Sequence, residues 1–291
     1  MSFSVIENIS EEAIKRKVDD LGNKPLTIFS HGYTGVNGIK LMDSAKESGR
    51  DYTKNSKQYP AIAIMDVILA AHRDYNKQVE KHVACLRKNY QDITFKKLKD
   101  NYLNKMNYIE FKEVWGHKDE KKYEILKELI SAIFKLGNPK SKEEDFLLMK
   151  DWAKNSSIDM KVTDPVGKIK HIGLATFQHL RMTFGIDTVK PDQRVKEVLE
   201  NEFNQKKLSS ENAIIAAEQI AKIVKLKPLV IDQLFVKYGS GYYRSETKAI
   251  KEEVQKIIEK LLLQNVSKEK IANATNWSLS QINSLKISHD K

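Results

Sequence analysis

The chain has almost no cysteine, and this excludes several kinds of site. Cys85 is the single cysteine among 291 residues. A disulfide framework, a four-cysteine zinc site and a four-cysteine iron–sulfur cluster are therefore excluded. One cysteine suits a reducing compartment, and no secretory or lipidation signal is recognisable. We expect a cytoplasmic protein that uses no cofactor.

Glycine, proline and long apolar runs are also scarce. The chain has 12 Gly and 6 Pro. An apolar stretch such as 61–71 contains Asp66 and is far shorter than the roughly 20 residues of a membrane span. Apolar residues recur at helical spacing nearly everywhere, without a sustained period of two bounded by turn residues. We therefore expect an all-α monomer outside the membrane, with one large domain or two interlocked ones.

The charge is unbalanced toward the basic side. The chain has 50 basic and 39 acidic residues, a formal net charge of +11 and a pI near 9.3. This excess indicates a polyanionic partner such as nucleic acid. The skew of the basic residues toward lysine, together with abundant asparagine, is equally typical of an A/T-rich genome. Composition alone leaves both explanations open.

Local signals place the helices. Ser10 is an N-cap candidate, Ser209 or Ser210 caps a later helix, and Pro60 and Pro228 each open one. Helices are expected within the following ranges: 121–136, 143–154, 174–184, from 191 to about 203, from 210 to 224 and from 228 to 239. The Gly-rich stretch 30–38 is expected to be a loop.

A hairpin-like segment lies in the second half of the chain. Residues 169–177 read Ile-Lys-His-Ile-Gly-Leu-Ala-Thr-Phe. This segment resembles the hairpin of the helix-hairpin-helix DNA glycosylase superfamily: a hydrophobic residue, Pro, Gly, a hydrophobic residue, Gly, two variable positions and Thr-Ala. Gly173 and Thr176 match the pattern, whereas Lys170 and His171 replace its proline and first glycine.

The resemblance implies that the hairpin binds DNA. In such a hairpin, backbone N–H groups and a helix N-terminus face a phosphate, which anchors DNA independently of its sequence. A bound monovalent cation is also usual, here at the carbonyls of Ile169 and Ile172. The alternative is a plain helix–turn–helix packing corner. The implied DNA-binding residues of this segment are Lys168, Lys170, His171, Ile172, Gly173, Ala175 and Thr176.

An aspartate follows the hairpin at the family's spacing. Asp192 lies 17 residues after Ala175, and the phrase Val-Lys-Pro-Asp-Gln-Arg-Val at 189–195 resembles the family pattern around its catalytic carboxylate. The resemblance makes Asp192 the catalytic residue and Arg194 a DNA contact. Breaking an N-glycosidic bond builds positive charge on the sugar, which a fixed carboxylate stabilises. An Asp in a helix's first turn is also favoured by the helix dipole alone.

Ala175 occupies the position where strand-cutting family members carry a lysine. Alanine cannot form the Schiff base that this chemistry requires. The resemblance therefore implies a monofunctional glycosylase that uses water as the nucleophile. A displaced amine from Lys168 or Lys170 is the alternative.

A second resemblance lies upstream. Residues 61–81 are similar to the family's early barrel helix, which ends in two small residues and a polar one that fills the gap left by a flipped base. His72 takes this place, with Arg73 beside it. These residues either occupy the duplex gap or simply solvate a helix end.

The resemblance implies a two-lobed helix-hairpin-helix glycosylase fold without an iron–sulfur cluster. The expected domains are a helical barrel at 60–185, a second lobe from 1–59 with 186–243, and a tail at 244–291. The tail resembles a small helix-turn-helix with a miniature core and is either a DNA contact or a protein-docking cap. Its expected core residues are Ile271, Ala272, Trp277, Leu279, Ile282 and Leu285, and Ser280, Gln281 and Asn283 would face DNA.

The implied function is hydrolytic release of a damaged or modified base from double-stranded DNA, for base-excision repair. If the chain is bacterial or archaeal, association with the nucleoid is expected. The alternatives are a non-catalytic DNA-binding protein with the same fold and a glycosylase that acts on modified bases of foreign DNA. The basic residues Lys168, Lys170, Arg181, Lys190 and Arg194 are expected around the site. Neutralising Lys168 and Lys170 should then reduce the salt dependence of binding more than neutralising Lys121 and Lys122.

Overall fold

Helices build most of the part of the chain that the computed structural model describes. The structure describes Ile6, residues 9–26, 39–73, 75–243, 256–264 and 266–275, and Ile282. Within these ranges there is no strand, and one isolated bridge joins Pro25 to Lys40. The prediction of an all-α protein is confirmed for the described residues. None of their helices is long and apolar enough to cross a membrane.

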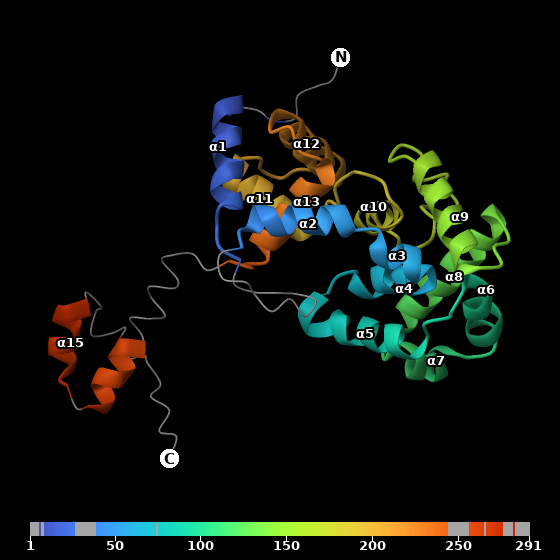
Figure 1. Ribbon diagram of the computed structural model, residues 1–291, viewed down its shortest axis with the longest axis horizontal. Coiled ribbons are helices and arrows are strands. Elements are labelled where there is room, and N and C mark those ends of the chain that lie inside the picture. Colours follow the sequence, from blue (N-terminus) through green and yellow to red (C-terminus); the bar gives the residue numbers. More distant parts are fainter. Residues whose placement is uncertain are drawn as a thin grey trace. The chain divides into compact units, whose positions relative to one another are not determined.

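The chain divides into two compact units, Met1–Tyr242 and Tyr243–Lys291. In the first unit, one group of helices packs around α13 (Pro228–Gly239) (Figure 1). The helices α2 (Leu41–Asp51), α11 (Gln193–Phe203) and α12 (Ser210–Ile223) all contact α13. Helix α1 (Glu11–Gly22) adds to the group through contacts with these four helices. This group therefore joins segments from both ends of the first unit.

The intervening residues form a second group around α4 (Pro60–Ala70). Nine of the eleven α4 residues are buried, as expected for a helix that is apolar all round. The buried residues of this group form one hydrophobic core from Ala61 to Phe184. The other elements are α3 (Lys54–Gln58), η1 (Tyr75–Val79), α5 (Glu80–Asn89), α6 (Phe95–Lys97), η2 (Leu98–Leu103), α7 (Tyr108–Trp115), α8 (Glu120–Leu136), α9 (Lys142–Asn155) and α10 (Leu174–Thr183).

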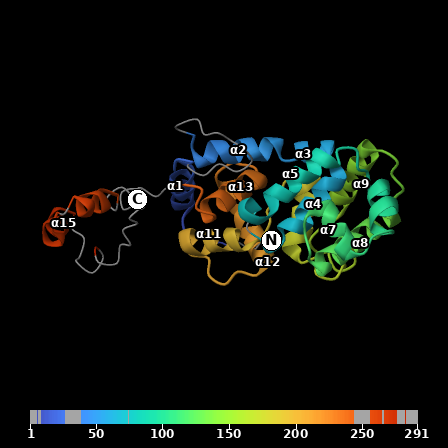
Figure 2. The ribbon, with the colours of Figure 1, turned by 90° about the horizontal axis from the view of Figure 1, so that it is seen from below.

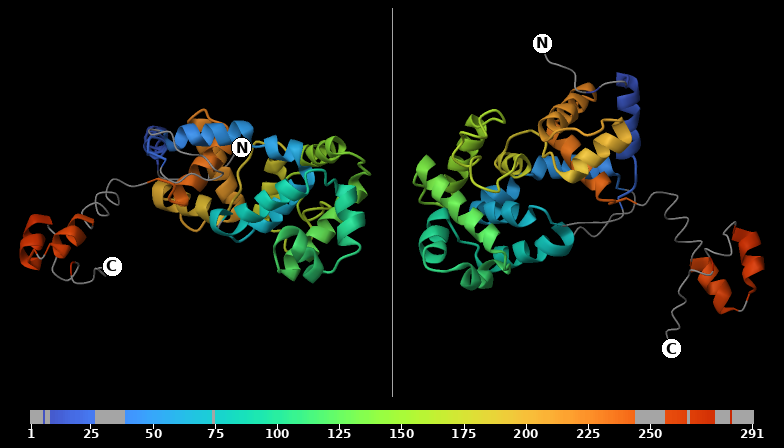
Figure 3. Two further views of the ribbon diagram at one scale, coloured as in Figure 1. Left: turned by 60° about the horizontal axis from the view of Figure 1, so that its bottom comes forward. Right: turned by 180° about the vertical axis from the view of Figure 1, so that it is seen from behind.

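Two connections join the two helix groups. The first is Tyr52–Thr53, between α2 and α3, and the second is 184–192, between α10 and α11. Figures 2 and 3 show α2 leading directly into α3 at the place where the groups meet. The two connections carry Tyr52, Lys190 and Asp192. The division of this unit into domains at 60–185 and at 1–59 with 186–243 stays a prediction.

Local signals predicted several helix starts correctly. The Ser10 side chain accepts a hydrogen bond from Ala13 N (3.2 Å) and caps α1. The Ser209 side chain caps α12 by accepting from Asn212 N (3.0 Å). Pro60 and Pro228 lie in the first turns of α4 and α13. These predictions are confirmed because a cap or a first-turn proline depends on neighbouring residues alone.

The second unit has a small core of its own. Ile258, Ile271 and Ile282 are buried together. Helix α15 (Lys268–Thr275) supplies Ile271, and the helical residues 256–263 supply Ile258. Of the expected core, Ile271, Ala272 and Ile282 take part, and the sequence analysis missed Ile258. The following predicted residues lie outside the described ranges: Trp277, Leu279, Ser280, Gln281, Asn283 and Leu285.

Candidate functional site

Asp192 is held rigidly at the start of α11. It is the N-cap residue, with extended backbone angles (φ −82°, ψ 176°), and its Oδ1 accepts a hydrogen bond from Val195 N (3.1 Å). The sequence placed it in the first helical turn, and the structure places it one position earlier. A carboxylate at this position satisfies a free N–H group and interacts favourably with the helix dipole.

The second carboxylate oxygen of Asp192 pairs with Lys190. Lys190 Nζ lies 3.0 Å from Asp192 Oδ2, and the two side chains are 23% and 26% exposed. Asp192 N–H also donates to the Lys190 carbonyl (2.8 Å), so Lys190, Pro191 and Asp192 form a tight three-residue turn. Burial lowers the pKa of Lys190, but Asp192 and Asp232 together outweigh burial and leave that pKa raised. Lys190 is therefore an ammonium ion at neutral pH.

Helix α13 fixes the connection that carries this pair. Lys190 N donates to Asp232 Oδ1 (2.8 Å), and Leu229 N donates to Asp187 Oδ1 (2.9 Å). The Asp232 side chain is buried, and burial raises its pKa to about 7. The charge of Lys190 opposes this rise, so the Asp232 carboxyl lies within electrostatic range of the Lys190 ammonium.

A buried hydrogen-bond network fixes the same connection to α10 and α12. Gln178 Nε2 donates to Thr188 Oγ1 (2.9 Å), which donates to Glu218 Oε1 (2.8 Å). Arg181 Nη1 donates to Gln178 Oε1 (2.6 Å) and Arg181 Nε to the Ala153 carbonyl (3.4 Å). Arg181 was expected among the basic residues around the DNA site. The structure instead engages its guanidinium in this network, where it holds the fold together.

Asp66 adds a further acid from α4. It accepts a hydrogen bond from Tyr75 OH (3.1 Å) and lies 3.7 Å from Arg87 Nη2, both through Oδ2. Its Oδ1 is buried and has no hydrogen-bond partner in the described part of the chain. Burial raises the pKa of Asp66 to about 6, against the lowering effect of Arg87, Tyr75 and Lys190. The influence of Lys190 places Asp66 near the Lys190–Asp192 pair.

Tyr52 and His179 complete the cluster. Burial raises the pKa of Tyr52 well above its usual value, and the charges of Asp232, Asp66 and Asp192 raise it further. Burial, with a smaller effect from Lys190, keeps the pKa of His179 well below its usual range, so its ring is neutral. The cluster thus draws groups from both connections and from α4, α10 and α13. It lies where the two helix groups of the first unit meet.

The predicted hairpin is a tight turn before α10. Ile172 N donates to the Ile169 carbonyl (3.0 Å), and His171 has φ +70°. Positive φ favours glycine, and His171 stands where the related pattern has its first glycine. The backbone conformation expected of a glycine is therefore retained by a histidine. Gly173 is the N-cap of α10, with no capping side chain and open space around its α-carbon.

Asp164 stabilises the loop that leads into this turn. Its Oδ1 accepts hydrogen bonds from Val166 N and Gly167 N (2.8 Å each) and its Oδ2 from Trp152 Nε1 (3.0 Å). A Cβ at Gly167 would lie 2.3 Å from the Lys161 carbonyl oxygen, so this position requires glycine. The loop that precedes the predicted phosphate anchor is thus fixed from α9.

The hairpin residues differ in exposure. Lys168, Lys170, His171 and Gly173 are exposed, and Ala175 and Thr176 are half-buried in the first turn of α10. Ile172 is 2% exposed, so only its backbone can reach a ligand. The exposed cations and the free N–H groups of the first α10 turn can together hold a phosphate. The cation proposed for the Ile169 and Ile172 carbonyls stays a prediction.

His72 and Arg73 directly follow α4, as the sequence suggested. His72 is exposed and has φ +59°. Lys122 Nζ caps this end of α4 by donating to the carbonyls of Ile68 (2.6 Å), Leu69 (3.2 Å) and Ala71 (2.8 Å). Lys122 is only 8% exposed. Lys122 is therefore unsuitable as a remote comparison for the hairpin lysines, because its amine supports the segment that carries His72.

Arg194 lies in the first turn of α11, two residues after Asp192. Its Nη1 is 3.0 Å from Glu197 Oε2, and its side chain is 51% exposed. An exposed ion pair of this kind contributes little to stability, so Arg194 is free to exchange Glu197 for a phosphate.

The sequence analysis did not assign functional roles to several members of the cluster. These are Tyr52, Asp66, Tyr75, His179 and Asp232, and Lys190 was noted only as a nearby charge. One signal was available: Asp66 interrupts the otherwise apolar α4, Asp232 follows an apolar run in α13, and a buried acid needs a partner. Tyr52 and His179 carry no comparable signal.

Comparison with known proteins adds no assignment. No protein-family model matches the chain, and searches of curated proteins and of solved structures gave no significant match. Fold family, enzymatic activity, cofactor use, DNA binding, oligomeric state and location therefore stay predictions.

Proposed function

We propose that the protein is a monofunctional DNA glycosylase with the helix-hairpin-helix fold, which hydrolyses the N-glycosidic bond of a flipped damaged or modified base. The arrangement of Asp192 carries this proposal. One oxygen of its carboxylate is fixed by a helix N-terminus and the other by the Lys190 ammonium. The pair is partly exposed and lies among buried or half-buried titratable groups with shifted pKa values, as is typical of active sites.

In the proposed reaction, Asp192 stabilises the charge that develops on the sugar. The C1′–N bond breaks with its electron pair going to the base, which leaves after protonation. Water adds to C1′ and gives up a proton, for which the Asp192 carboxylate is the acceptor. Because the pKa of Lys190 is raised, its amine is protonated and is not the nucleophile. Together with Ala175, this supports hydrolysis without strand cleavage.

The remaining residues would hold and open the duplex. Lys168, Lys170 and the N-terminus of α10 would bind backbone phosphates, as in sequence-independent anchoring generally. His72 would fill the gap left by the flipped base, with Arg73 against the orphaned base or a phosphate. Extrusion of a base costs a few kcal/mol, least where the base is damaged or mispaired.

The test is base release from a panel of duplexes that contain alkylated, deaminated, oxidised, mismatched and phage-type modified bases, with alkali to reveal abasic sites. We expect strand breaks only after alkali. Asp192→Asn should lower release by at least 100-fold, because asparagine caps the helix but carries no charge. Glu200→Gln, an exposed change on the same helix, is the matched control.

The same panel separates the alternatives. Duplex binding without release of any base would overturn the catalytic proposal and support a non-catalytic DNA-binding protein. Release restricted to the phage-type bases would support a role against foreign DNA. Full release by Asp192→Asn would show that another group is the catalytic carboxylate.

A further inference from the structure

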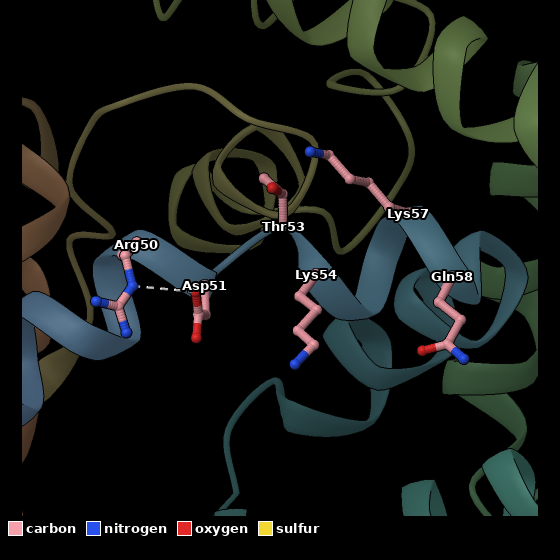
Figure 4. Close-up of a pocket in the computed structure, with 6 residues that line it drawn as sticks. All are labelled: Arg50, Asp51, Thr53, Lys54, Lys57 and Gln58. Carbon is pink, nitrogen blue, oxygen red and sulfur yellow. Dashed lines mark hydrogen bonds and ion pairs between the residues drawn. The ribbon is translucent and has the colours of Figure 1, made fainter.

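A basic pocket lies where α2 passes into α3 (Figure 4). Its volume is about 450 Å³, and it opens to solvent. None of the predicted site residues lines it. The lining residues are Arg50, Asp51, Thr53, Lys54, Lys57 and Gln58.

The lining of the pocket suits an oxyanion. The lining holds three cations and one carboxylate, and Arg50 Nε lies 3.3 Å from Asp51 Oδ1. Figure 4 shows the Lys57 side chain on the same side of the segment as Thr53 and the Lys54 side chain on the opposite side, and neither amine has an ion-pair partner within the described ranges. The Thr53 hydroxyl and the Gln58 amide add neutral hydrogen-bond donors. A phosphate group needs this combination of positive charge and donors.

The pocket and the cluster around Asp192 include neighbouring residues of the chain. Tyr52 belongs to that cluster and lies between two pocket residues, Asp51 and Thr53. Two trans-peptide steps separate Tyr52 from Lys54, so their α-carbons are at most about 7.6 Å apart. The pocket is therefore the direct continuation in the chain of a residue on which the charge of Asp192 acts.

Contacts with the end of α10 fix the position of the pocket. Ser56 Oγ donates to the Thr183 carbonyl (2.6 Å, buried), and a Cβ at Gly185 would lie 3.7 Å from Thr53. The predicted hairpin lies at the opposite end of α10, whose 10 residues span about 15 Å. The pocket and the hairpin therefore lie at opposite ends of α10.

We propose that this pocket binds the DNA backbone on the strand that carries the flipped nucleotide, as a second phosphate anchor besides the hairpin. The proposal rests on the proposed function in taking DNA as the partner. Two anchors at the ends of α10 hold the strand on both sides of the reacting sugar. Since both lysines are exposed, their replacement leaves the fold intact.

The first test is the salt dependence of binding to a duplex with one tetrahydrofuran abasic analogue, which has no base to release. Lys54→Gln with Lys57→Gln should reduce the slope of log affinity against log salt by about 0.9 for each phosphate lost. The matched control is Lys121→Gln with Lys135→Gln, which removes the same charge from exposed positions of α8. Equal slopes for the two double variants would overturn the proposal.

The second test identifies the phosphate. Single neutral methylphosphonates are placed along both strands, and each is combined with the pocket variant in a double-mutant cycle. We expect one or two adjacent positions, next to the analogue on its own strand, where the modification weakens binding by the wild type but not by the pocket variant. Additive effects at every position would overturn the proposal. The proposal would also be overturned if inorganic phosphate bound the pocket in isothermal titration but the double-mutant cycle showed no coupling between the pocket and any DNA phosphate.

The outcomes separate this proposal from the proposed function. Base release that depends on Asp192, without coupling at any phosphate, contradicts the pocket alone. Coupling at one phosphate without base release from any duplex contradicts the glycosylase activity alone. If the wild type binds no duplex, both are wrong.

Discussion

The ammonium of Lys190 lies 3.0 Å from the carboxylate of Asp192, and Pro191 separates the two residues in the chain. The pair lies beside Asp232 and within electrostatic range of Asp66. Three acids therefore share the charges of Lys190 and of Arg87, which pairs with Asp66. Loss of the Lys190 ammonium would leave Asp192 and Asp232 without their nearest cation.

Lys190→Gln should therefore impair base release while duplex binding at the hairpin persists. A charge-assisted hydrogen bond is worth about 1.5–3 kcal/mol, which corresponds to roughly a 10- to 100-fold loss of rate. The variant should also shift the acid limb of the pH–rate profile upward, because Lys190 lowers the pKa of Asp232. The measurement is single-turnover release between pH 5 and 9. An unchanged profile would show that the effect of Lys190 on the carboxyl of Asp232 does not reach Asp192.

The same residue provides the test for strand cleavage. Borohydride reduction during turnover traps a Schiff base as a covalent protein–DNA adduct. We expect no adduct with the wild type, because the Lys190 amine is protonated and Ala175 carries no amine. An adduct that disappears in Lys190→Gln would identify Lys190 as a nucleophile and contradict the hydrolytic mechanism.

Several helix starts could be predicted from the sequence because their signals are local. Ser10 and Ser209 cap helices through bonds that span three residues. The surroundings of Asp192 depend on distant segments instead. Asp66 lies 126 positions before it and Asp232 lies 40 after it. No local pattern reports such a distance, so the sequence points to Asp192 but not to Asp66 or Asp232.

Two residues show how local reading misleads. A histidine at position 171 favours a negative φ, yet its φ is +70°, in the region that favours glycine. Lys122 follows Lys121 in a charged stretch of the sequence, which is typical of solvated surface residues. In the structure it is buried, and its amine donates hydrogen bonds to three carbonyls at the end of α4, those of Ile68, Leu69 and Ala71.

This arrangement predicts a large difference between two adjacent lysines. Lys122→Met should lower the free energy of unfolding by roughly 2–4 kcal/mol, because buried carbonyls without a donor are costly. Lys121→Met, at an exposed position, should change it by less than about 0.5 kcal/mol. Urea denaturation of the two variants measures the difference. Equal stabilities would show that the amine of Lys122 is not needed at the end of α4.

A buried acid remote from the site predicts how stability varies with pH. Asp145 is fully buried, accepts a hydrogen bond from Phe95 N (2.8 Å) through Oδ2, and has no hydrogen-bond partner for Oδ1. Burial raises its pKa from 3.8 to about 7. The native state therefore binds this proton more tightly than the unfolded state does. The resulting stabilisation is complete below about pH 4 and is lost as the pH rises to about 7.

Asp145→Asn should remove this dependence. A single proton changes the free energy of unfolding by about 1.4 kcal/mol per pH unit within that window, so the variant should gain stability relative to the wild type from pH 4.5 to 7 and then stay level. Asp66 and Asp232 act in the same direction, and part of the slope therefore remains. The comparison uses urea denaturation at each pH, with the exposed Asp151→Asn on the same helix as control. Parallel curves for wild type and Asp145→Asn would show that the Asp145 carboxyl titrates alike in both states and is not penalised by its burial.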